Sequence, residues 1–351
     1  MAAQRKSKGK TKKPQPPPST ARRLARILAG CVVLSQIALA ALGDWFVHHP
    51  REWIAARPAF IARPLIAYGD PVGDFTDAIG LTGTDTIYEY DEDPPNGEVY
   101  FAGEPVRVGD PAPNDIQVLQ RGNFAIGWSP SYRHPVWVAY HVPPRDTITA
   151  EPANPAQRPS FQKDRSVDSS PAANAYEGSG YDRGHLAPNY AFATRFGESE
   201  RKRTFLMTNI VPQTPALNRG AWRDLEHRIA DLWSGRYGEV WVIVGTVSGG
   251  EARPRLESGV ELPDAFFQLV LAQTSDGLRA LAVLLPQDIS SHAYPTRYVV
   301  SIAELETMTG LNLLPNLPGF IAKPLKAQTP TRLWPVGLGG AIDLILSRFA
   351  N

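Results

Sequence analysis

Short runs of apolar and β-branched residues recur along the chain from about residue 98 onward, separated by turn-forming Gly, Pro, Asn and Asp. Several runs are almost continuously apolar, which is typical of strands that are covered on both faces. The pattern predicts strands over residues 98–102, 123–127, 136–142, 204–211, 240–247, 266–273 and 278–285. Residues 144–180 are rich in Pro, Ser and Ala without any period, and this composition indicates a surface loop.

A helical period appears in two later segments. Apolar residues recur at spacings of three, four and three positions along residues 218–235. These residues are Trp222, Leu225, Ile229 and Leu232. Their spacing predicts a helix with one apolar stripe, and a shorter helix is predicted over residues 302–308, closed by Gly310. Strands in an irregular order with few helices favour an α+β fold over a regular series of βαβ units.

Residues 27–43 are uncharged and mostly apolar, and residues 1–26 before them carry nine Lys and Arg and no acidic residue. A spanning helix needs about 20 apolar residues and a cleavable signal has an apolar core of about 7–15, so this length lies between the two. Two interpretations therefore stay open. The long basic leader favours an uncleaved membrane anchor, whereas Ala38-Leu39-Ala40 offers a cleavage site. In both cases the basic residues stay cytoplasmic and the rest is exported.

The chain is thus expected to contain a basic cytoplasmic tail, a transmembrane anchor or signal segment, a spacer rich in Pro, Gly and Asp, a folded domain and a C-terminal tail. These parts cover residues 1–26, 27–43, 44–97, 98–325 and 326–351, in that order. The only cysteine, Cys31, lies in the apolar segment, so no disulfide is expected within the folded domain.

The charge of the chain is unevenly distributed. Outside residues 1–26, the remaining 27 Lys and Arg face 35 Asp and Glu, so the rest of the chain is acidic. A protein of this charge cannot hold a polyanion by its overall field and needs a local basic patch. Residues 181–236 hold nine Lys and Arg against six Asp and Glu, and we expect such a patch there.

Candidate chemistry centres on His185, which ends the run Tyr181-Asp182-Arg183-Gly184-His185. A neutral His near pH 7 can accept a proton from water, and Arg183 offers a planar fork that fits phosphate oxygens. Gly184 allows a close approach of the backbone. Taken alone, this run is equally compatible with an ordinary turn that contains a hydrogen-bonded His.

A second group of polar residues lies on the first predicted helix. Asn218, Trp222 and Glu226 are spaced by four and four, so they share one edge, with Asn218 and Glu226 roughly 12 Å apart along the axis. The amide oxygen of Asn218 is a suitable ligand for Mg²⁺, and Glu226 can hold a water of that ion. The alternative is a helix that begins with a capping Asn and carries a solvated Glu.

Three ordered motifs resemble the DNA/RNA non-specific endonucleases. They are Tyr-Asp-Arg-Gly-His-Leu-Ala-Pro at 181–188, Thr-Asn-Ile-Val-Pro-Gln at 208–213, and Leu-Asn-Arg-Gly-Ala-Trp at 217–222 followed by Leu225-Glu226. The resemblance extends from about residue 98 to 318. It implies the ββα-metal (His-Me finger) nuclease fold, an α+β fold with a central, mostly antiparallel sheet flanked by helices.

The resemblance also implies an activity, which is metal-dependent endonucleolytic hydrolysis of DNA and RNA with little sequence preference. His185 matches the general base, Asn218 the only protein ligand of Mg²⁺, and Glu226 the residue that orients a metal-bound water. The metal stabilises the departing 3′ oxygen through a bound water, which leaves a 5′-phosphate. Mn²⁺ is a possible substitute for Mg²⁺, and a homodimer is compatible with the resemblance.

Further positions of the family's site can be matched. Arg183 corresponds to an arginine beside the site, and Asn209 and Gln213 to polar residues that line and order it. The family commonly places a phosphate-binding arginine twelve residues after the metal-binding Asn, but this chain has Ala230 there.

Other basic residues are candidates for the missing phosphate contact. Arg219, Arg223 and Arg228 lie on the same predicted helix, but Arg228 is displaced by about 160° from position 230. Arg133, in Ser131-Tyr132-Arg133-His134, is another candidate, unless it lies on a solvated loop.

Two other functions remain possible from the sequence. One is a catalytically weak or inactive envelope protein that keeps the nuclease fold to bind nucleic acid or a protein partner, as Ala230 and the acidic body suggest. Its DNA binding would persist without metal. The other is a metallo-phosphodiesterase, which would prefer small phosphodiesters over polymers.

Overall fold

The computed structural model describes residues 87–89, 98–148, 151–154, 157–249, 253–291, 293–337 and 340. All of them belong to one compact unit, which spans residues 73–351. The expected basic tail, the anchor or signal segment and most of the expected spacer lie outside the described residues. Within the described part, no helix has both the length and the apolar character needed to cross a membrane.

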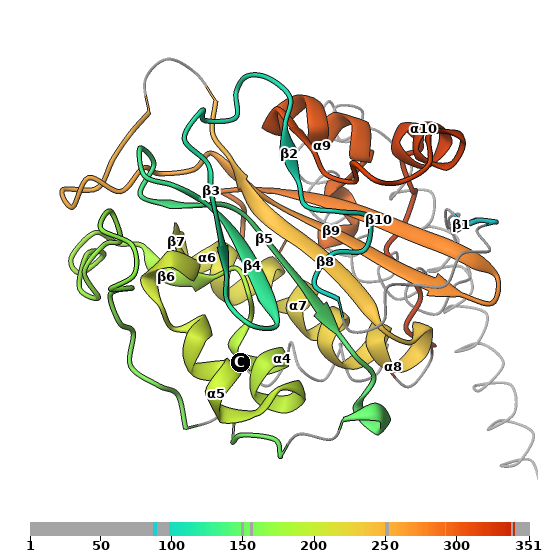
Figure 1. The fold of residues 1–351 in the computed structure, drawn as a ribbon, viewed down its shortest axis with the longest axis horizontal. Helices are drawn as coiled ribbons and strands as arrows, with labels where there is room; N and C mark the ends of the chain where they lie inside the picture. Colours follow the sequence, from blue (N-terminus) through green and yellow to red (C-terminus); the bar gives the residue numbers. More distant parts are fainter. Residues whose placement is uncertain are drawn as a thin grey trace, which may run out of the picture. The chain divides into compact units, whose positions relative to one another are not determined.

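A central antiparallel sheet forms the middle of the domain (Figure 1), with the strand order β1-β10-β9-β8-β5-β4-β3 and β11 paired with β10. Its strands are β1 Ile87–Tyr88, β3 Gln117–Gln120, β4 Phe124–Ser129, β5 His134–Val142, β8 Val240–Val247, β9 Ala265–Thr274, β10 Gly277–Pro286 and β11 Val299–Val300. Every residue of β4, β5 and β8 is buried, as expected for a sheet that is covered on both faces.

Alternate residues of each long strand enter two separate hydrophobic cores. In β5, Val138 and Tyr140 face one core, whereas Trp137 and Ala139 face the other. The first core packs against α4 Asn189–Arg195 and a long helical segment over residues 215–237, and α5 Gly197–Thr204 follows α4 directly. The second core packs against α9 Ile302–Thr309 and α10 Gly319–Ala327. Figure 1 shows α4 to α8 on one side of the sheet and α9 and α10 on the other.

The domain also contains a small two-stranded sheet and two short 3₁₀ turns. β2 Val106–Arg107 pairs with β12 Leu311–Asn312 in a two-stranded sheet. Short 3₁₀ turns, η1 Arg145–Thr147 and η5 Pro295–Tyr298, lie in connecting segments.

The expected fold class, a central antiparallel sheet flanked by helices, is confirmed. The strand predicted over residues 240–247 has the same bounds as β8, and the strands predicted at 123–127, 136–142, 266–273 and 278–285 correspond to β4, β5, β9 and β10. The helix predicted at residues 302–308 is α9, with a Ser301–Glu304 capping box and a left-handed Gly310 (φ 67°) at its end.

Two strand predictions were wrong in whole or in part. Residues 98–102 form no strand, and Phe101 instead packs edge-on against Trp241 with ring centroids 5.3 Å apart. Residues 204–211 form a strand only at their end. Before this strand the chain makes a 3₁₀ turn, η2 Met207–Asn209, and the Met207 N–H donates a hydrogen bond to the Gln162 carbonyl.

Candidate active site

A two-stranded ribbon and the helix that follows it carry the sequence motifs. β6 Asp182–His185 pairs antiparallel with β7 Ile210–Gln213, outside the main sheet. The helical segment is built from α6 Pro215–Leu217, η3 Asn218–Trp222, α7 Arg223–His227, η4 Arg228–Trp233 and α8 Ser234–Tyr237. Together they form the strand-strand-helix unit that the resemblance implies.

The helical segment begins earlier than the sequence indicates. Thr214 precedes it, and its side chain accepts a hydrogen bond from the Leu217 N–H at 3.4 Å, as an N-cap residue does. Asn218 is therefore not the helix cap. The backbone departs from helical geometry at Gly220 (φ −102°, ψ −115°), so the straight-helix spacing of Asn218 and Glu226 does not hold strictly. Both residues nevertheless line the same cleft.

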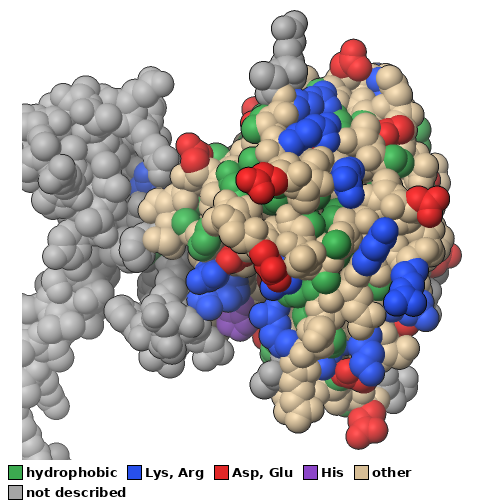
Figure 2. Space-filling view, turned by 90° about the vertical axis from the view of Figure 1, so that its left-hand side faces the viewer, with side chains coloured by type: hydrophobic (Ala, Val, Ile, Leu, Met, Phe, Trp, Pro, Cys, Tyr) green, Lys and Arg blue, Asp and Glu red, His purple; other side chains and the backbone are tan. Residues whose placement is uncertain are grey.

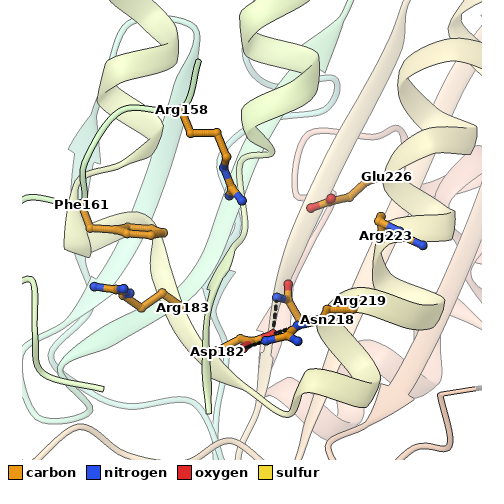
Figure 3. Close-up of a pocket in the computed structure, with 8 residues that line it drawn as sticks. All are labelled: Arg158, Phe161, Asp182, Arg183, Asn218, Arg219, Arg223 and Glu226. Carbon is orange, nitrogen blue, oxygen red and sulfur yellow. Dashed lines mark hydrogen bonds and ion pairs between the residues drawn. The ribbon is translucent and has the colours of Figure 1, made fainter. Parts of the chain in front are cut away.

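A polar cleft of about 530 Å³ lies between the ribbon, the helix and the preceding loop (Figure 3). Its lining residues are Arg158, Phe161, Asp182, Arg183, Asn218, Arg219, Arg223 and Glu226. Four arginines against two carboxylates give the lining a positive balance, and three of these arginines lie within residues 181–236, where the sequence indicates a basic patch.

His185 lies directly behind this lining, at the end of β6. The residue is 7% exposed, and its ring packs against Phe205 and Phe161 with centroid distances of 4.7 and 5.4 Å. Burial lowers the pKa of His185 to about 3, and the positive charge of Arg158 acts in the same direction. Its Nε2 is buried and has no hydrogen-bond partner among the described residues. The ring is thus a neutral imidazole with an unused nitrogen.

Asn218 is held in one orientation by Asp182. The Asn218 Nδ2 donates to Asp182 Oδ2 at 2.9 Å, and the Arg219 guanidinium donates to both oxygens of the same carboxylate at 2.8 and 2.7 Å. Although burial alone would raise the pKa of Asp182, these hydrogen bonds from Arg219 and Asn218 hold it below its ordinary value. Figure 3 shows the amide oxygen of Asn218 pointing away from Asp182, on the side of Arg158 and Glu226.

Glu226 faces the cleft from the next turns of the helix. The Trp222 indole N–H donates to Glu226 Oε1 at 3.0 Å and lies 3.3 Å from the His185 carbonyl oxygen, which ties the helix to β6. Glu226 is half-buried as a residue, and desolvation by burial raises the pKa of its carboxyl group to about 8, against the Trp222 hydrogen bond and the charges of Arg158 and Arg223. A cation bound beside it would favour the charged form.

These donors fit a hard divalent cation. The cleft offers one neutral amide oxygen, from Asn218, and one carboxyl group whose charged form is disfavoured by burial, from Glu226. The described residues include no cluster of three or more His, Cys, Asp or Glu side chains suited to hold a metal. A donor set with so few oxygens suits Mg²⁺, which keeps several waters and is often completed by phosphate.

Asn209 and Gln213 lie outside the cleft lining, so the expectation that they line it is corrected. The Asn209 amide is fully buried and is bonded to the Ala187 N–H, the Ala187 carbonyl and the Thr204 carbonyl at 2.8, 3.0 and 2.9 Å. It therefore fixes the backbone just after His185. The buried Gln213 side chain lies across Gly184, where an added Cβ would be 2.1 Å from the Gln213 Oε1.

The expectation for Arg133 is also corrected. Arg133 does not line the cleft, and its guanidinium donates to the carbonyls of Ser258 and Ser169 at 2.9 and 3.4 Å. The residue has a φ of 61°, which is uncommon for a residue with a side chain. Arg133 thus joins two loops and is not placed to contact a phosphate in the cleft.

The helix supplies only part of the expected phosphate contact. Ala230 is 1% exposed and belongs to the core, and Arg228 is fully buried with its Nε 3.4 Å from Asp224 Oδ1. Arg228 therefore cannot substitute for the missing arginine. Arg219 and Arg223 do line the cleft.

Three lining residues were not predicted as site residues from the sequence: Arg158, Phe161 and Asp182. Arg158 and Phe161 come from the aperiodic loop before the motif, and no spacing or composition marks them. The Arg183 guanidinium stacks on the Phe161 ring, with its carbon 4.6 Å from the ring centroid. It also donates a hydrogen bond to the Ala173 carbonyl at 2.9 Å. Asp182 belongs to the first motif, and its position next to Arg183 in the sequence could have indicated that it lines the site.

Comparison with known proteins agrees with this geometry. The sequence profile described as DNA/RNA non-specific endonuclease matches residues 102–320. A protein from Nostoc sp. named nuclease is 31% identical over 226 residues, which cover 61% of this chain and 79% of that protein. Mitochondrial endonuclease G of Homo sapiens is 28% identical over 229 residues, which cover 61% of this chain and 74% of that protein.

A solved structure shares the fold. The crystal structure of an EndoG/EndoGI complex aligns with a TM-score of 0.51 and 21% identity, over 57% of this chain and 86% of the matched chain. The strand-strand-helix unit, the cleft beside it and the profile match over most of the described domain agree with one another. The chain therefore belongs to the DNA/RNA non-specific endonuclease family, whose members are hydrolases that cut nucleic acids.

Proposed function

We propose that this protein is a Mg²⁺-dependent endonuclease that cuts DNA and RNA with little sequence preference and leaves 5′-phosphate ends. The observation that carries the proposal is the neutral, unpartnered Nε2 of His185 behind a cleft that contains Asn218, Glu226 and four arginines. A base, a metal ligand and phosphate-binding cations are the groups that phosphodiester hydrolysis requires.

In this proposal His185 is the general base. Water attacks phosphorus, its proton passes to Nε2, and the bond from phosphorus to the 3′ oxygen breaks. A bound phosphodiester raises the pKa of the ring, because a nearby anion favours imidazolium. Burial keeps the ring neutral before the substrate arrives, since it lowers the pKa to about 3.

Asn218 and Glu226 are proposed to hold the metal and its water. Asp182 fixes the Asn218 amide so that its oxygen is available to hold the ion, and Glu226 lines the same cleft, where it would orient a water of that ion. When bound, Mg²⁺ supplies positive charge for the departing 3′ oxygen. Mn²⁺ prefers similar oxygen ligands and is expected to substitute for it.

The arginines of the cleft are suited to both DNA and RNA as substrates. Arg158, Arg183, Arg219 and Arg223 can donate to phosphate oxygens, which DNA and RNA share. Contacts to phosphates position a nucleic acid without reading its bases, so cleavage is expected to depend little on sequence.

Purified full-length protein in detergent, incubated with supercoiled plasmid or with RNA, tests this function. We expect Mg²⁺ to support nicking and RNA degradation, EDTA to stop both, and the new ends to be ligatable 5′-phosphates. If DNA is bound in EDTA but never cut when Mg²⁺ is added, the inactive nucleic-acid-binding protein is the better description. Cleavage of small phosphodiesters in preference to polymers would favour the phosphodiesterase.

We also propose that the nuclease domain acts outside the cytoplasm, either anchored in the membrane or released after cleavage. The support is the uncharged, mostly apolar run at residues 27–43 behind a leader with nine basic residues. Protease added to intact cells should degrade the domain if it is anchored and exposed. Recovery of the whole domain in the cytosolic fraction would contradict the proposal.

A further inference from the structure

A single glycine bends the helical segment between the proposed metal ligand and Glu226. Asn218 (φ −59°, ψ −43°) and Trp222 (φ −64°, ψ −50°) have helical backbone angles, whereas Gly220 between them has φ −102° and ψ −115°. The ψ of Gly220 differs by about 70° from that of an α-helix. The direction of the chain therefore changes after Asn218 and before Glu226.

This bend bears on the orientation of Asn218. On a straight α-helix every side chain leans toward the N-terminus, so Asn218 would lean away from Glu226, which would lie about 12 Å farther along the axis. A ligand of Mg²⁺ lies about 2.1 Å from the ion, and a carboxylate that holds one of the ion's waters lies about 3 Å from that water. The oxygens of the two side chains must therefore be within about 5 Å of each other to serve one ion. In the structure the Asn218 amide oxygen is on the side of Glu226 (Figure 3).

The missing side chain of Gly220 makes room for another part of the backbone. A Cβ added at Gly220 would lie 3.0 Å from the Ser291 carbonyl oxygen and 3.5 Å from the Ser291 Cα. The segment over residues 287–291 is also attached to the start of the helix. Gln287 Oε1 accepts a hydrogen bond from the Thr214 N–H at 2.9 Å, and the Gln287 carbonyl accepts one from the Thr214 hydroxyl at 2.6 Å. This segment therefore supports the bend from one side.

The residues just before the bend are fixed by β6. The Asp182 carboxylate accepts hydrogen bonds from Asn218 at 2.9 Å and from Arg219 at 2.8 and 2.7 Å. Glu226 lies after the bend, in the part of the helix whose apolar side belongs to the first core. The bend at Gly220 thus sets the angle between the part that carries the amide oxygen and the part that carries the carboxyl group.

We propose that Gly220 is a positioning residue for the metal ion, because the bend that it allows, supported by the Ser291 carbonyl, directs the Asn218 amide oxygen toward the ion that Glu226 also serves. The inference rests on the proposed nuclease function and deepens it. Alanine is the best helix former and glycine one of the poorest, so Gly220→Ala favours a straight helix. It also places a methyl group against the backbone of Ser291.

The test compares Mn²⁺ binding to Gly220→Ala and to Gly235→Ala, by EPR of the free ion during titration of the full-length protein in detergent. Gly235 lies on α8 of the same helical segment, and a Cβ added there meets no atom within 4 Å. Loss of a group that orients a metal ligand typically weakens metal binding by about 10-fold to 100-fold. We expect a loss of that size for Gly220→Ala and wild-type affinity for Gly235→Ala.

Two further measurements separate a positioning role from a structural one. Melting in EDTA reports folding independently of the metal. Because His185 is unchanged in Gly220→Ala, we expect its cleavage rate to return toward that of wild type as the Mg²⁺ concentration is raised. Wild-type Mn²⁺ affinity in Gly220→Ala, or a loss of cleavage that Mg²⁺ does not restore in the folded variant, would overturn the inference.

A second variant covers the case in which Gly220→Ala does not fold. Gln287→Ala keeps Gly220 but removes the side-chain bonds to the Thr214 N–H and to the Pro212 carbonyl, which hold the supporting segment. We expect weaker Mn²⁺ binding here too, and unchanged affinity would contradict the inference. If wild type neither binds Mn²⁺ nor cuts DNA with Mg²⁺, the proposed function itself has failed. If wild type does both and the variants bind Mn²⁺ equally well, only the role of Gly220 has failed.

Discussion

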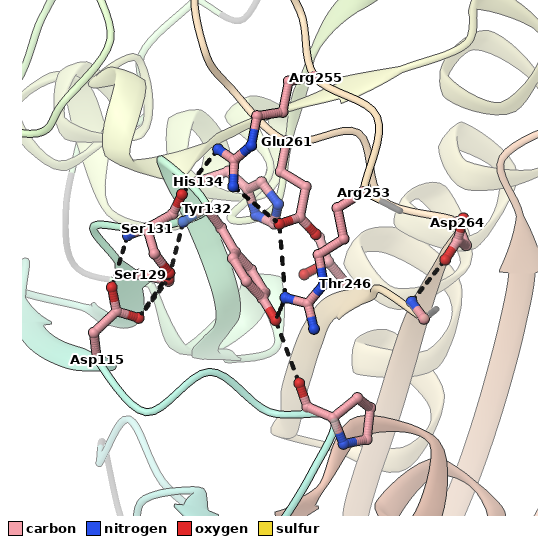
Figure 4. Close-up of polar contacts among 12 residues, drawn as sticks. Asp115, Ser129, Ser131, Tyr132, His134, Thr246, Arg253, Arg255, Glu261 and Asp264 are labelled. Carbon is pink, nitrogen blue, oxygen red and sulfur yellow. Dashed lines mark hydrogen bonds and ion pairs between the residues drawn. The ribbon is translucent and has the colours of Figure 1, made fainter. Parts of the chain in front are cut away.

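At the scale of single residues, burial is the main cause of the lowered pKa values of two histidines. His185 and His134 are both buried, and each has an Nε2 without a partner among the described residues. Burial lowers the pKa of His134 to about 4, with Arg255 acting in the same direction and a hydrogen bond to the Pro135 carbonyl opposing it. Figure 4 shows His134 beside Glu261, to which Arg253 and Arg255 turn.

This burial predicts a loss of stability in acid. Between its ordinary pKa of about 6.5 and its folded value of about 4, His134 binds a proton only in the unfolded chain, so stability falls as the pH drops through this range. The free energy of unfolding of both proteins should fall between pH 7 and pH 4.5. We expect this fall to be about 2 kcal/mol smaller in His134→Asn than in wild type. Urea unfolding at the two pH values measures the difference.

Glu261 has the opposite effect on the pH dependence of stability. Because burial raises its pKa, its protonation in acid stabilises the folded state. The comparison of wild type with His134→Asn removes this contribution, since both chains contain Glu261. Equal acid sensitivity of the two proteins would show that His134 titrates normally in the folded state.

At the scale of elements, the sequence identifies the elements that have a periodic apolar pattern. The strands β8, β9 and β10 and the stripe of Trp222, Leu225 and Ile229 are predicted correctly because burial on a regular element imposes its period on the residues. β6 has no such pattern, since Asp182–His185 contains charged residues and a glycine. It is a strand because β7 pairs with it, and that long-range pairing leaves no local signal.

The candidate site likewise contains residues that sequence motifs identify and residues that only tertiary contacts place there. Arg183, Asn218 and Glu226 are found from motifs, and they do line one cleft. Arg158 is not found, because it reaches the cleft from a loop whose path depends on tertiary contacts such as the pairing of Gln162 with Leu206. Arg133, a candidate that the sequence left open against a solvated loop, does not line the cleft, and its neighbours in sequence say nothing about the loops that it joins.

At the scale of the whole molecule, the chain beyond residue 26 has a negative net charge, and the proposed substrate, a nucleic acid, is negative as well. Apart from residues 1–26 the chain is acidic, and Figure 2 shows basic side chains at several places on one face with acidic ones between them. A polyanion is therefore expected to be held mainly by the arginines of the cleft.

This distribution predicts a marked salt dependence of cleavage. Three or four phosphate contacts lower affinity by about 40-fold to 150-fold when salt rises from about 50 mM to about 200 mM. We expect kcat/KM on a long DNA substrate to fall by that factor at a constant concentration of free Mg²⁺. A rate that stays constant over this range would mean that few phosphates are bound by cationic side chains.

The central claim is that His185 activates the attacking water, and the cleavage rate of His185→Ala tests it most directly. Initial rates of plasmid nicking and RNA degradation with Mg²⁺ are compared between this variant and wild type, after both have been shown to melt at similar temperatures. Loss of a general base typically costs about 100-fold to 10,000-fold, and we predict a loss in this range on both substrates. Wild-type rates in His185→Ala would contradict the account.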